Sequence, residues 1–269
     1  MLTGTNSHRI SRTKKLLQVF EFAGLLVFLT WLMYNGTESL GYNWQWYRIP
    51  RYILEPGPGL VPGPLLQGLG VTLKITAAGL LLTIVFGLTT ALFRLSGSLT
   101  ANLVARFYLE TIRNTPLMIQ LLFNYFVLSP ILGISSFWTA VITLALFEGA
   151  YASEIIRAGI TSIEHGQWEA GRSIGLSEAQ TYTYIIIPQT LKLVLPPITS
   201  QSVSLIKDSA LVSTIAIYDL TMQGQALISK TFLTFEIWFT VAGIYLILAL
   251  SISGLIRLLD PDKKPRTQP

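Results

Sequence analysis

The stretch LQGLGVTLKITAAGLLLTIVFGLTTALF, residues 66–93, holds a single charged side chain, Lys74, and no proline. A helix needs roughly 20 consecutive, mostly apolar residues to cross the hydrocarbon core of a bilayer. Because this stretch exceeds that length, it can cross the bilayer with some tilt. We therefore predict a membrane-spanning helix over residues 66–93.

Five further apolar runs repeat this pattern on either side. Of the 269 residues, 51% are hydrophobic and only 12% are charged, whereas soluble domains carry about 25% charged residues. The sequence therefore predicts an all-α, polytopic membrane protein with about six transmembrane helices. The other expected helices cover residues 16–34, 103–128 with an interruption at Pro116, 136–157, 182–205 with breaks at Pro188, Pro196 and Pro197, and 235–259.

The first apolar run, residues 16–34, follows a basic cluster between Arg9 and Lys15. A basic start is also typical of a cleaved signal peptide, but this run is long and no A-x-A-like site follows it. We therefore interpret it as an uncleaved first span. The next segment, residues 35–64, is rich in Trp, Tyr, Pro and Gly. That composition favours an external connector near the lipid headgroups and excludes one continuous helix.

The basic residues collect on one side of the predicted bundle. With six spans, both termini and the loop between the fourth and fifth spans share that side, which the positive-inside rule identifies as the cytoplasm. The formal net charge of +5 is therefore a topology signal, and we expect no nucleic-acid partner. Cysteine is absent, and we find no metal-ligand spacing or cofactor motif, so we expect neither a metal nor a cofactor.

The loop between the fourth and fifth spans, residues 161–181, is the most polar long run among the apolar ones, and we call it the polar hairpin. Thr161–Glu164 and Ser177–Gln180 each have the spacing of a capping box, which begins a helix. Gly175 stands where a left-handed residue ends one. Glu169 and Arg172 can pair at i,i+3, or one of them can face a partner. A solvated loop is the alternative, but the two caps and the glycine favour a rigid docking surface.

Within this hairpin the chain resembles a known family. Glu169-Ala170-Gly171, then Gly175, then Ile185-Ile186-Ile187-Pro188 resemble the EAA loop of ABC-importer permeases, usually written EAA-x3-G-x9-I-x-L-P. Gly171 replaces the second alanine and Ile187 replaces the leucine. The similarity extends over residues 66–259 to the polar amino-acid permease branch. Its further motifs are Glu110–Leu117, Tyr151–Ile160, Gly166-Gln167, Leu195–Pro197 and Lys207–Leu211.

The resemblance implies a five-helix type I ABC-importer core, residues 66–260. An N-terminal helix and periplasmic connector, residues 1–65, would precede it, and a cytoplasmic tail, residues 261–269, would follow. The chain would be the permease subunit of an ATP-driven importer of polar amino acids in the bacterial inner membrane, with both termini cytoplasmic. The implied partners are two ATP-binding-cassette ATPase subunits, a second permease subunit (a paralogue or a copy of this chain), an extracytoplasmic amino-acid-binding protein and membrane lipid.

By the same resemblance, the polar hairpin is a coupling helix that sits in a cleft of the ATPase subunit. The expected coupling residues are Glu169, Ala170, Gly171, Arg172 and Gly175. The chain has no G-x-x-x-x-G-K-[ST] phosphate loop, so ATP hydrolysis must belong to a partner. We therefore expect a subunit that is not itself an enzyme.

Polar residues inside the predicted spans are candidates for the substrate path, because ionisable groups are costly there. Glu148 either holds a substrate ammonium or makes an interhelical hydrogen bond. Lys74 could complement Glu148 or a substrate carboxylate, and Lys207 with Asp208 could contact substrate or form a local ion pair. The full set of path candidates is Glu148, Lys74, Thr72, Gln120, Gln201, Lys207 and Asp208. The i,i+3 pairs Glu110–Arg113 and Glu154–Arg157 are interpreted as structural or gating.

Two other classes of protein were weighed. An ion-gradient-driven secondary amino-acid transporter would favour inverted internal repeats with paired broken helices, and we find no convincing repeat. A membrane-embedded enzyme would need a catalytic constellation, but the two histidines, His8 and His165, are both on the predicted cytoplasmic side.

Overall fold

The structure is a computed structural model that describes residues 6–39, 41–57, 59 and 61–259. The chain divides into two compact units, Met1–Trp46 and Tyr47–Pro269. The first unit consists of helix α1, Asn6–Ser39, followed by a short aromatic segment. Residues Leu17–Gly36 of α1 are apolar and long enough to cross a membrane, as the sequence predicts.

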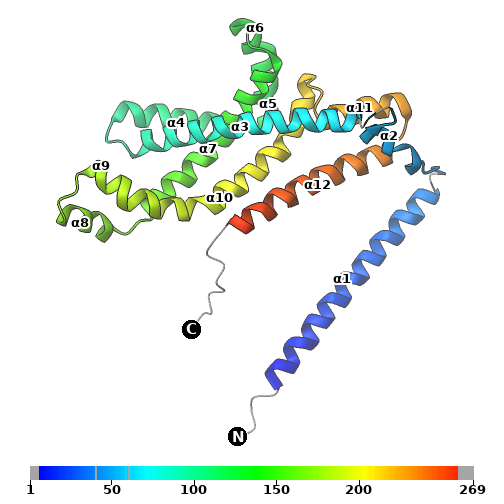
Figure 1. Cartoon of the computed structure of the whole chain (residues 1–269), viewed down its shortest axis with the longest axis horizontal. Helices are drawn as coiled ribbons and strands as arrows, with labels where there is room; N and C mark the ends of the chain where they lie inside the picture. Colours follow the sequence, from blue (N-terminus) through cyan, green and yellow to red (C-terminus); the bar gives the residue numbers. More distant parts are fainter. Residues whose placement is uncertain (1–5, 40, 58, 60, 260–269) are drawn as a thin grey trace. The chain divides into compact units, whose positions relative to one another are not determined.

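The second unit is built mainly of helices (Figure 1). Its first segment contains the 3-10 turn η1 and a two-stranded antiparallel sheet in which Leu54 lies opposite Pro62. The elements, in chain order, are η1 Trp46–Arg48, α2 Pro50–Ile53, β1 Leu54–Glu55, β2 Val61–Pro62, α3 Pro64–Leu95, α4 Leu99–Arg113, α5 Leu117–Phe123, the π turn η2 Asn124–Leu128, α6 Ser129–Leu132, α7 Ser136–Thr161, α8 His165–Ser173, α9 Glu178–Thr181, the π turn η3 Tyr182–Ile186, α10 Ile187–Asp208, the 3-10 turn η4 Ser209–Ile215, α11 Leu220–Thr231 and α12 Thr234–Leu259.

Four helices in the described residues are long and apolar enough to cross a membrane: the apolar part of α1, then α3, α7 and residues Thr234–Gly254 of α12. A fifth is obtained if the bent pair α4 and α5–α6 counts as one span. Helix α10 is not apolar enough to belong to this set, because it contains several Pro, Ser, Gln and Lys residues among its apolar ones. The all-α membrane class is therefore confirmed, while six spans remain a prediction.

The interruption predicted at Pro116 in the apolar run 103–128 is confirmed, and it is a sharp bend. Helix α4 ends at Arg113, α5 begins at Leu117, and the two directions differ by 103°. Pro116 has no backbone N–H and restricts the residue before it, which ends a helix. Gln120 then fixes the bend, because its Nε2 donates to the carbonyl oxygens of Ile112 at 2.8 Å and Thr115 at 3.1 Å.

The breaks predicted at Pro196 and Pro197 of the fifth apolar run are wrong, whereas next to Pro188 the π turn η3 gives way to α10. Helix α10 runs from Ile187 to Asp208 with Pro196 and Pro197 in its interior, and Pro188 lies in its first turn. A proline near the start of a helix removes an N–H that has no partner there. The two interior prolines are tolerated because neighbouring helices hold both halves of α10; Val194 and Leu205 are both buried.

Small residues let α7 approach its neighbours closely. A Cβ on Gly149 would lie 2.9 Å from the Cβ of Phe86 in α3, and one on Gly159 would lie 2.2 Å from a methyl group of Val194 in α10. Close backbone approach at glycine is the usual way in which membrane helices associate. Helix α7 is therefore the central helix of the unit, packed against both α3 and α10.

Two buried clusters stabilise the unit. The first joins α3, α5, α7 and η4 around Leu121 and Leu144. The second joins α2, α3, α11 and α12 around Tyr52 and Leu220. In the second cluster, Asp219 caps α11 by accepting from the backbone N–H of Met222 at 2.8 Å, and Thr72 Oγ1 accepts from that of Leu220 at 3.1 Å.

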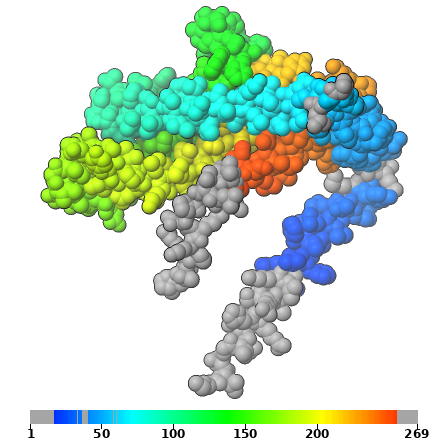
Figure 2. Space-filling view, viewed as in Figure 1, coloured from blue at the N-terminus to red at the C-terminus, as the bar shows by residue number. Residues whose placement is uncertain are grey.

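Within this unit, the polar hairpin (α8 and α9) and the pair α2 and α11 lie at opposite ends of the long helices (Figure 1). The segment α5–α6 projects from the body, as Figure 2 shows in green. This projection carries exposed apolar side chains, including Phe126 and Ile131.

Candidate functional site

The polar hairpin has the glycine turn that the sequence predicts. Gly175 adopts a φ of 80°, a left-handed conformation that costs a residue with a Cβ roughly 1–2 kcal/mol. Its N–H donates to the carbonyl of Arg172 at 3.0 Å, and the N–H of Leu176 donates to that of Gly171 at 3.1 Å. These two bonds form a Schellman motif, so the end of α8 and the direction of the following chain are fixed.

One of the two predicted capping boxes is confirmed. Ser177 Oγ accepts from the backbone N–H of Gln180 at 3.3 Å, and the Gln180 side chain accepts from the N–H of Ser177 at 2.9 Å. The box predicted at Thr161–Glu164 is wrong, because α7 continues to Thr161. The Thr161 hydroxyl instead donates to the carbonyl of Arg157, four residues earlier in α7, at 3.0 Å. Threonine side chains commonly make this bond within a helix.

The inner face of α8 packs on the chain that follows it. Gly171 is buried, and a Cβ there would lie 2.8 Å from both Oγ1 and Cγ2 of Thr181. Trp168 meets the ring of Tyr182 edge-to-face, with the ring centroids 4.7 Å apart. The glycine at the second alanine position therefore permits close contact within the hairpin itself.

The outer face of α8 carries exposed polar side chains. Glu169 and Arg172 do not pair with each other as the sequence allowed: Glu169 lies 3.1 Å from His165 and Arg172 lies 3.5 Å from Glu178. Ala170 is also exposed, and Ile174, just after the helix, is 73% exposed. A rigid helix thus presents charged groups and one large apolar side chain to the solvent.

The polar hairpin is joined to two long helices. It follows α7 after a break of three residues, and it enters α10 through the π turn η3. The side-chain amide of Gln189 in α10 donates to that of Gln167 in α8 at 3.1 Å. Because α7 and α10 also touch at Gly159 and Val194, a displacement of the hairpin acts on both helices together.

A buried polar cluster, which we call the carboxyl cluster, lies between α7 and α10. Glu148 is fully buried near the middle of α7, and its Oε2 accepts from the Gln201 side chain. Asp208 and Lys207, at the end of α10, are close enough to act on Glu148 electrostatically. The structure therefore brings together four of the seven predicted path residues: Glu148, Gln201, Lys207 and Asp208.

The other three predicted path residues lie elsewhere. Lys74 is exposed on α3, whereas Thr72 and Thr76 are buried on the opposite face, so the expected pairing of Lys74 with Glu148 is wrong. Residues two apart on a helix point in different directions. Thr72 instead holds the start of α11, and Gln120 holds the α4–α5 bend.

A second charged cluster was only partly visible in the sequence. Glu154 bonds Arg94 of α3, lies 3.1 Å from Arg157 and lies 3.9 Å from Arg113 at the end of α4. The Glu154–Arg157 pair is confirmed, but the Glu110–Arg113 pair is not formed, since Glu110 accepts from Asn114 at 2.9 Å. Nothing in local spacing indicates the contact between Arg94 and Glu154, which depends on how α3 packs against α7.

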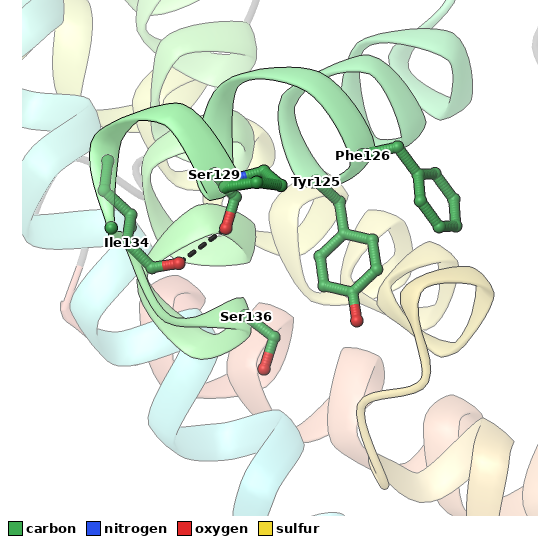
Figure 3. A pocket seen from close by; sticks show the side chains of 7 residues that line it. Tyr125, Phe126, Ser129, Ile134 and Ser136 are labelled. Carbon is green, nitrogen blue, oxygen red and sulfur yellow. Dashed lines mark hydrogen bonds between the residues drawn. The ribbon is translucent and has the colours of Figure 1, made fainter.

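An open pocket lies among η2, α6 and the start of α7 (Figure 3). It is lined by Tyr125, Ser129 and Ser136, among others, and Ser129 Oγ donates to the carbonyl of Ile134 at 2.5 Å. None of the predicted site residues lines it. No group of three or more potential metal-ligating side chains occurs in the part of the chain that the structure describes.

Comparison with known proteins gives concordant matches. Residues 79–265 match the family described as "Binding-protein-dependent transport system inner membrane component". The glutamine transport system permease protein GlnP of Escherichia coli (strain K12) is 40% identical over 203 residues, which cover 74% of this chain and 93% of that protein. The arginine transport system permease protein ArtQ of Bacillus subtilis (strain 168) is 34% identical over 202 residues, covering 74% and 92%. A crystal structure of an amino acid ABC transporter with histidines matches at 38% identity with a TM-score of 0.68, covering 73% of this chain and 92% of that one.

Proposed function

The chain belongs to the family of binding-protein-dependent transport system inner membrane components, and we propose that it forms the membrane path of an ATP-driven importer of polar amino acids. Its apolar helices and its family make it a multi-pass inner-membrane permease. Its relatives are named for glutamine and arginine transport, which supports amino acids as the substrate. This relationship does not favour an ion-gradient-driven secondary transporter.

The observation that carries the proposal is the continuity between the polar hairpin and the carboxyl cluster. Helices α7 and α10 are connected by the hairpin at one end, and both contribute side chains to the cluster. Packed helices transmit a displacement at one end as a shear or hinge movement of the whole element. Movement of a subunit docked on the hairpin would therefore change the surroundings of Glu148.

The hairpin residues divide into two roles in this proposal. Glu169, Ala170 and Arg172 lie on the exposed outer face of α8 and contact the ATPase subunit. Gly171 and Gly175 act indirectly, because they fix the packing and the turn that hold this face in place. The exposed Ile174 adds an apolar contact at the end of the same face.

The carboxyl cluster is the proposed substrate contact. Buried carboxylates in membrane proteins face cavities or partners and mark substrate paths. Glu148 would receive an amino group of the substrate, while Gln201 holds the carboxyl in place. Thr72, Lys74 and Gln120 have no such role, because they lie outside the cluster.

Membership of this family supports the assembly that we propose. The chain carries no phosphate loop, so two ATP-binding-cassette subunits hydrolyse ATP, and a second permease subunit (a copy of this chain or a paralogue) completes the path. An extracytoplasmic binding protein delivers the amino acid. We assign residues 66–260 to the permease domain, residues 1–65 to the N-terminal helix and connector, and residues 261–269 to a tail. We also propose that both termini and the polar hairpin lie in the cytoplasm, because the basic residues collect on that side.

Co-purification of the ATPase with the tagged chain tests the docking role. Glu169→Lys reverses a charge on the exposed face of α8, and we expect it to reduce the amount of bound ATPase at least tenfold. Glu55→Lys, the same change at an exposed position of β1 at the other end of the unit, is the matched control and should leave binding unchanged. Equal recovery of ATPase with both variants would contradict docking at this face.

A further inference from the structure

Three arginines share one carboxylate where α3, α4 and α7 meet, and we call this group the arginine cluster. Arg94 of α3 and Arg157 of α7 both donate hydrogen bonds to Glu154. Arg113, the last residue of α4, lies 3.9 Å from the Oε1 atom of Glu154, which is too far for a hydrogen bond. The carboxylate of Glu154 therefore bonds two of the three guanidinium groups and leaves the third without one.

The formal charge of the arginine cluster is positive. Arginine is always protonated in proteins, so its three positive charges face the one negative charge of Glu154. The other carboxylate on this part of α4, Glu110, accepts from Asn114 at 2.9 Å and pairs with no arginine in the described part of the chain. Even if Glu110 is counted, one positive charge remains in excess. The cluster is therefore set up to attract an anion.

The guanidinium groups of the arginine cluster are open to a ligand. The side chain of Arg113 is 45% exposed and that of Arg157 is 32% exposed. The guanidinium carbon of Arg113 lies 5.5 Å from the centre of the Tyr151 ring, a contact that holds the group in place while its N–H donors stay available. Such a planar group binds phosphate with two parallel hydrogen bonds.

The arginine cluster lies near one surface of the bilayer. Helix α3 has 32 residues and is therefore about 48 Å long, which exceeds the roughly 30 Å of the hydrocarbon core. Arg94 is in the last turn of α3, where the helix reaches the headgroup region. The turn between α3 and α4 and the polar hairpin lie at the same end of the unit (Figure 1), the end that we assign to the cytoplasm.

We propose that the arginine cluster binds the phosphate of an anionic phospholipid from the cytoplasmic leaflet. Basic pockets between membrane helices on the cytoplasmic side suit such headgroups. The cluster lies among α3, α4 and α7, whereas the face that we assign to the ATPase is on α8, and this separation favours a lipid over an acidic side chain of the ATPase. The inference goes beyond the proposed function, because it does not depend on what the permease carries.

Thermal unfolding of the delipidated complex of this chain with its ATPase tests the site. The probes are phosphatidylglycerol, phosphatidylethanolamine with the same acyl chains, and inorganic phosphate. We expect phosphatidylglycerol alone to raise the unfolding temperature, because its headgroup is anionic and its acyl chains keep it in the detergent micelle. Equal stabilisation by phosphatidylethanolamine, or the same stabilisation by inorganic phosphate without lipid, would overturn the inference.

Variants of Arg113 test the cluster itself, since this arginine makes no hydrogen bond to Glu154. Arg113→Gln should raise the concentration of phosphatidylglycerol that gives half of the stabilisation by about fivefold, the effect of one basic residue near an anionic headgroup. Arg113→Lys keeps the charge and should raise it less. Arg51→Gln, the same loss of charge at an exposed position of α2 at the other end of the unit, should leave it unchanged. An unchanged concentration in Arg113→Gln would contradict the site.

The amount of ATPase that co-purifies with Arg113→Gln separates the lipid from the protein partner. We expect this amount to equal that of the wild type, and its loss would assign the cluster to ATPase contact instead. ATP-driven uptake by the wild-type complex without any effect of phosphatidylglycerol would contradict the lipid site and leave the proposed function standing.

Discussion

Gly171 of α8 lies in direct contact with Thr181, the last residue of α9, and a Cβ on Gly171 would come within 2.8 Å of the threonine side chain. The surface that we assign to ATPase docking is therefore held by a contact inside the hairpin. Its shape depends on a residue that does not face the partner.

Gly171→Ala is expected to impair ATP-driven uptake, because overpacking at a tight contact costs about 1–3 kcal/mol. The double variant Gly171→Ala/Thr181→Ala should regain ATP-driven uptake, because the second substitution removes the threonine atoms that the new Cβ would contact. Thr181 Oγ1 has no hydrogen-bond partner, so its loss leaves no donor unsatisfied. Uptake rates of the single and double variants in vesicles measure the effect. A double variant as impaired as the single one would show that the contact does not matter.

Substitutions at Gly175 should follow the cost of the left-handed conformation. We expect Gly175→Asn to retain most of the bound ATPase, because asparagine tolerates this conformation, and Gly175→Val to lose most of it, at a cost of about 1–2 kcal/mol or more. The amount of ATPase that co-purifies with each variant measures the effect, and it should decrease from glycine to asparagine to valine at this position. Equal recovery with asparagine and valine would contradict the need for the turn.

The same substitution at Thr72 and at Thr76 should have different effects on the stability of the protein. Thr72→Val removes the acceptor of the buried Leu220 N–H, which should cost about 1–3 kcal/mol. Thr76 Oγ1 is buried without a partner, so Thr76→Val should be neutral or stabilising. Thermal unfolding of the purified complex measures both. If Thr72→Val changes the preference among amino acids and leaves the unfolding temperature unchanged, Thr72 belongs to the path after all.

Glu154 is expected to stabilise the junction of α3, α4 and α7. Glu154→Gln leaves Arg94, Arg113 and Arg157 without their shared carboxylate, and the half-buried setting suggests a loss of about 1–3 kcal/mol, between the values for exposed and buried pairs. Glu110→Gln, at an exposed site on α4, is the control. A thermal unfolding temperature that falls equally in both variants would contradict a specific role of Glu154.

Local pattern predicted much of the fold. The apolar runs at residues 66–93 and 136–157 correspond to α3 and α7, because a buried membrane helix is defined by its own composition. The Ser177 capping box and the Gly175 turn were predicted correctly for the same reason: both depend on residues within a few positions of each other. The capping box predicted at Thr161–Glu164 does not form. The Thr161 hydroxyl can either cap a new helix or donate to the carbonyl of Arg157, and because α7 continues to Thr161, it makes the second bond.

Features that depend on packing could not be predicted in this way. A proline within an apolar run looks the same in the sequence at Pro116 and at Pro196. The chain bends by 103° at Pro116, whereas α10 continues through Pro196. The difference depends on the neighbouring helices that pack on either side of each proline. All four members of the carboxyl cluster were candidates from the sequence, but their proximity was not predicted, and Lys74 was wrongly paired with Glu148. The contact between Arg94 and Glu154 joins residues sixty positions apart, which local spacing does not reveal.

The most direct test of the central claim is amino-acid uptake by liposomes that contain this chain, its ATPase and the second permease subunit if there is one, with binding protein outside. Uptake of radiolabelled amino acid is followed with ATP or a non-hydrolysable analogue inside, and with ion gradients collapsed by ionophores. We predict uptake that requires hydrolysable ATP and persists when the gradients are collapsed. Uptake that proceeds without the ATPase, or that ionophores abolish while ATP is present, would contradict an ATP-driven permease.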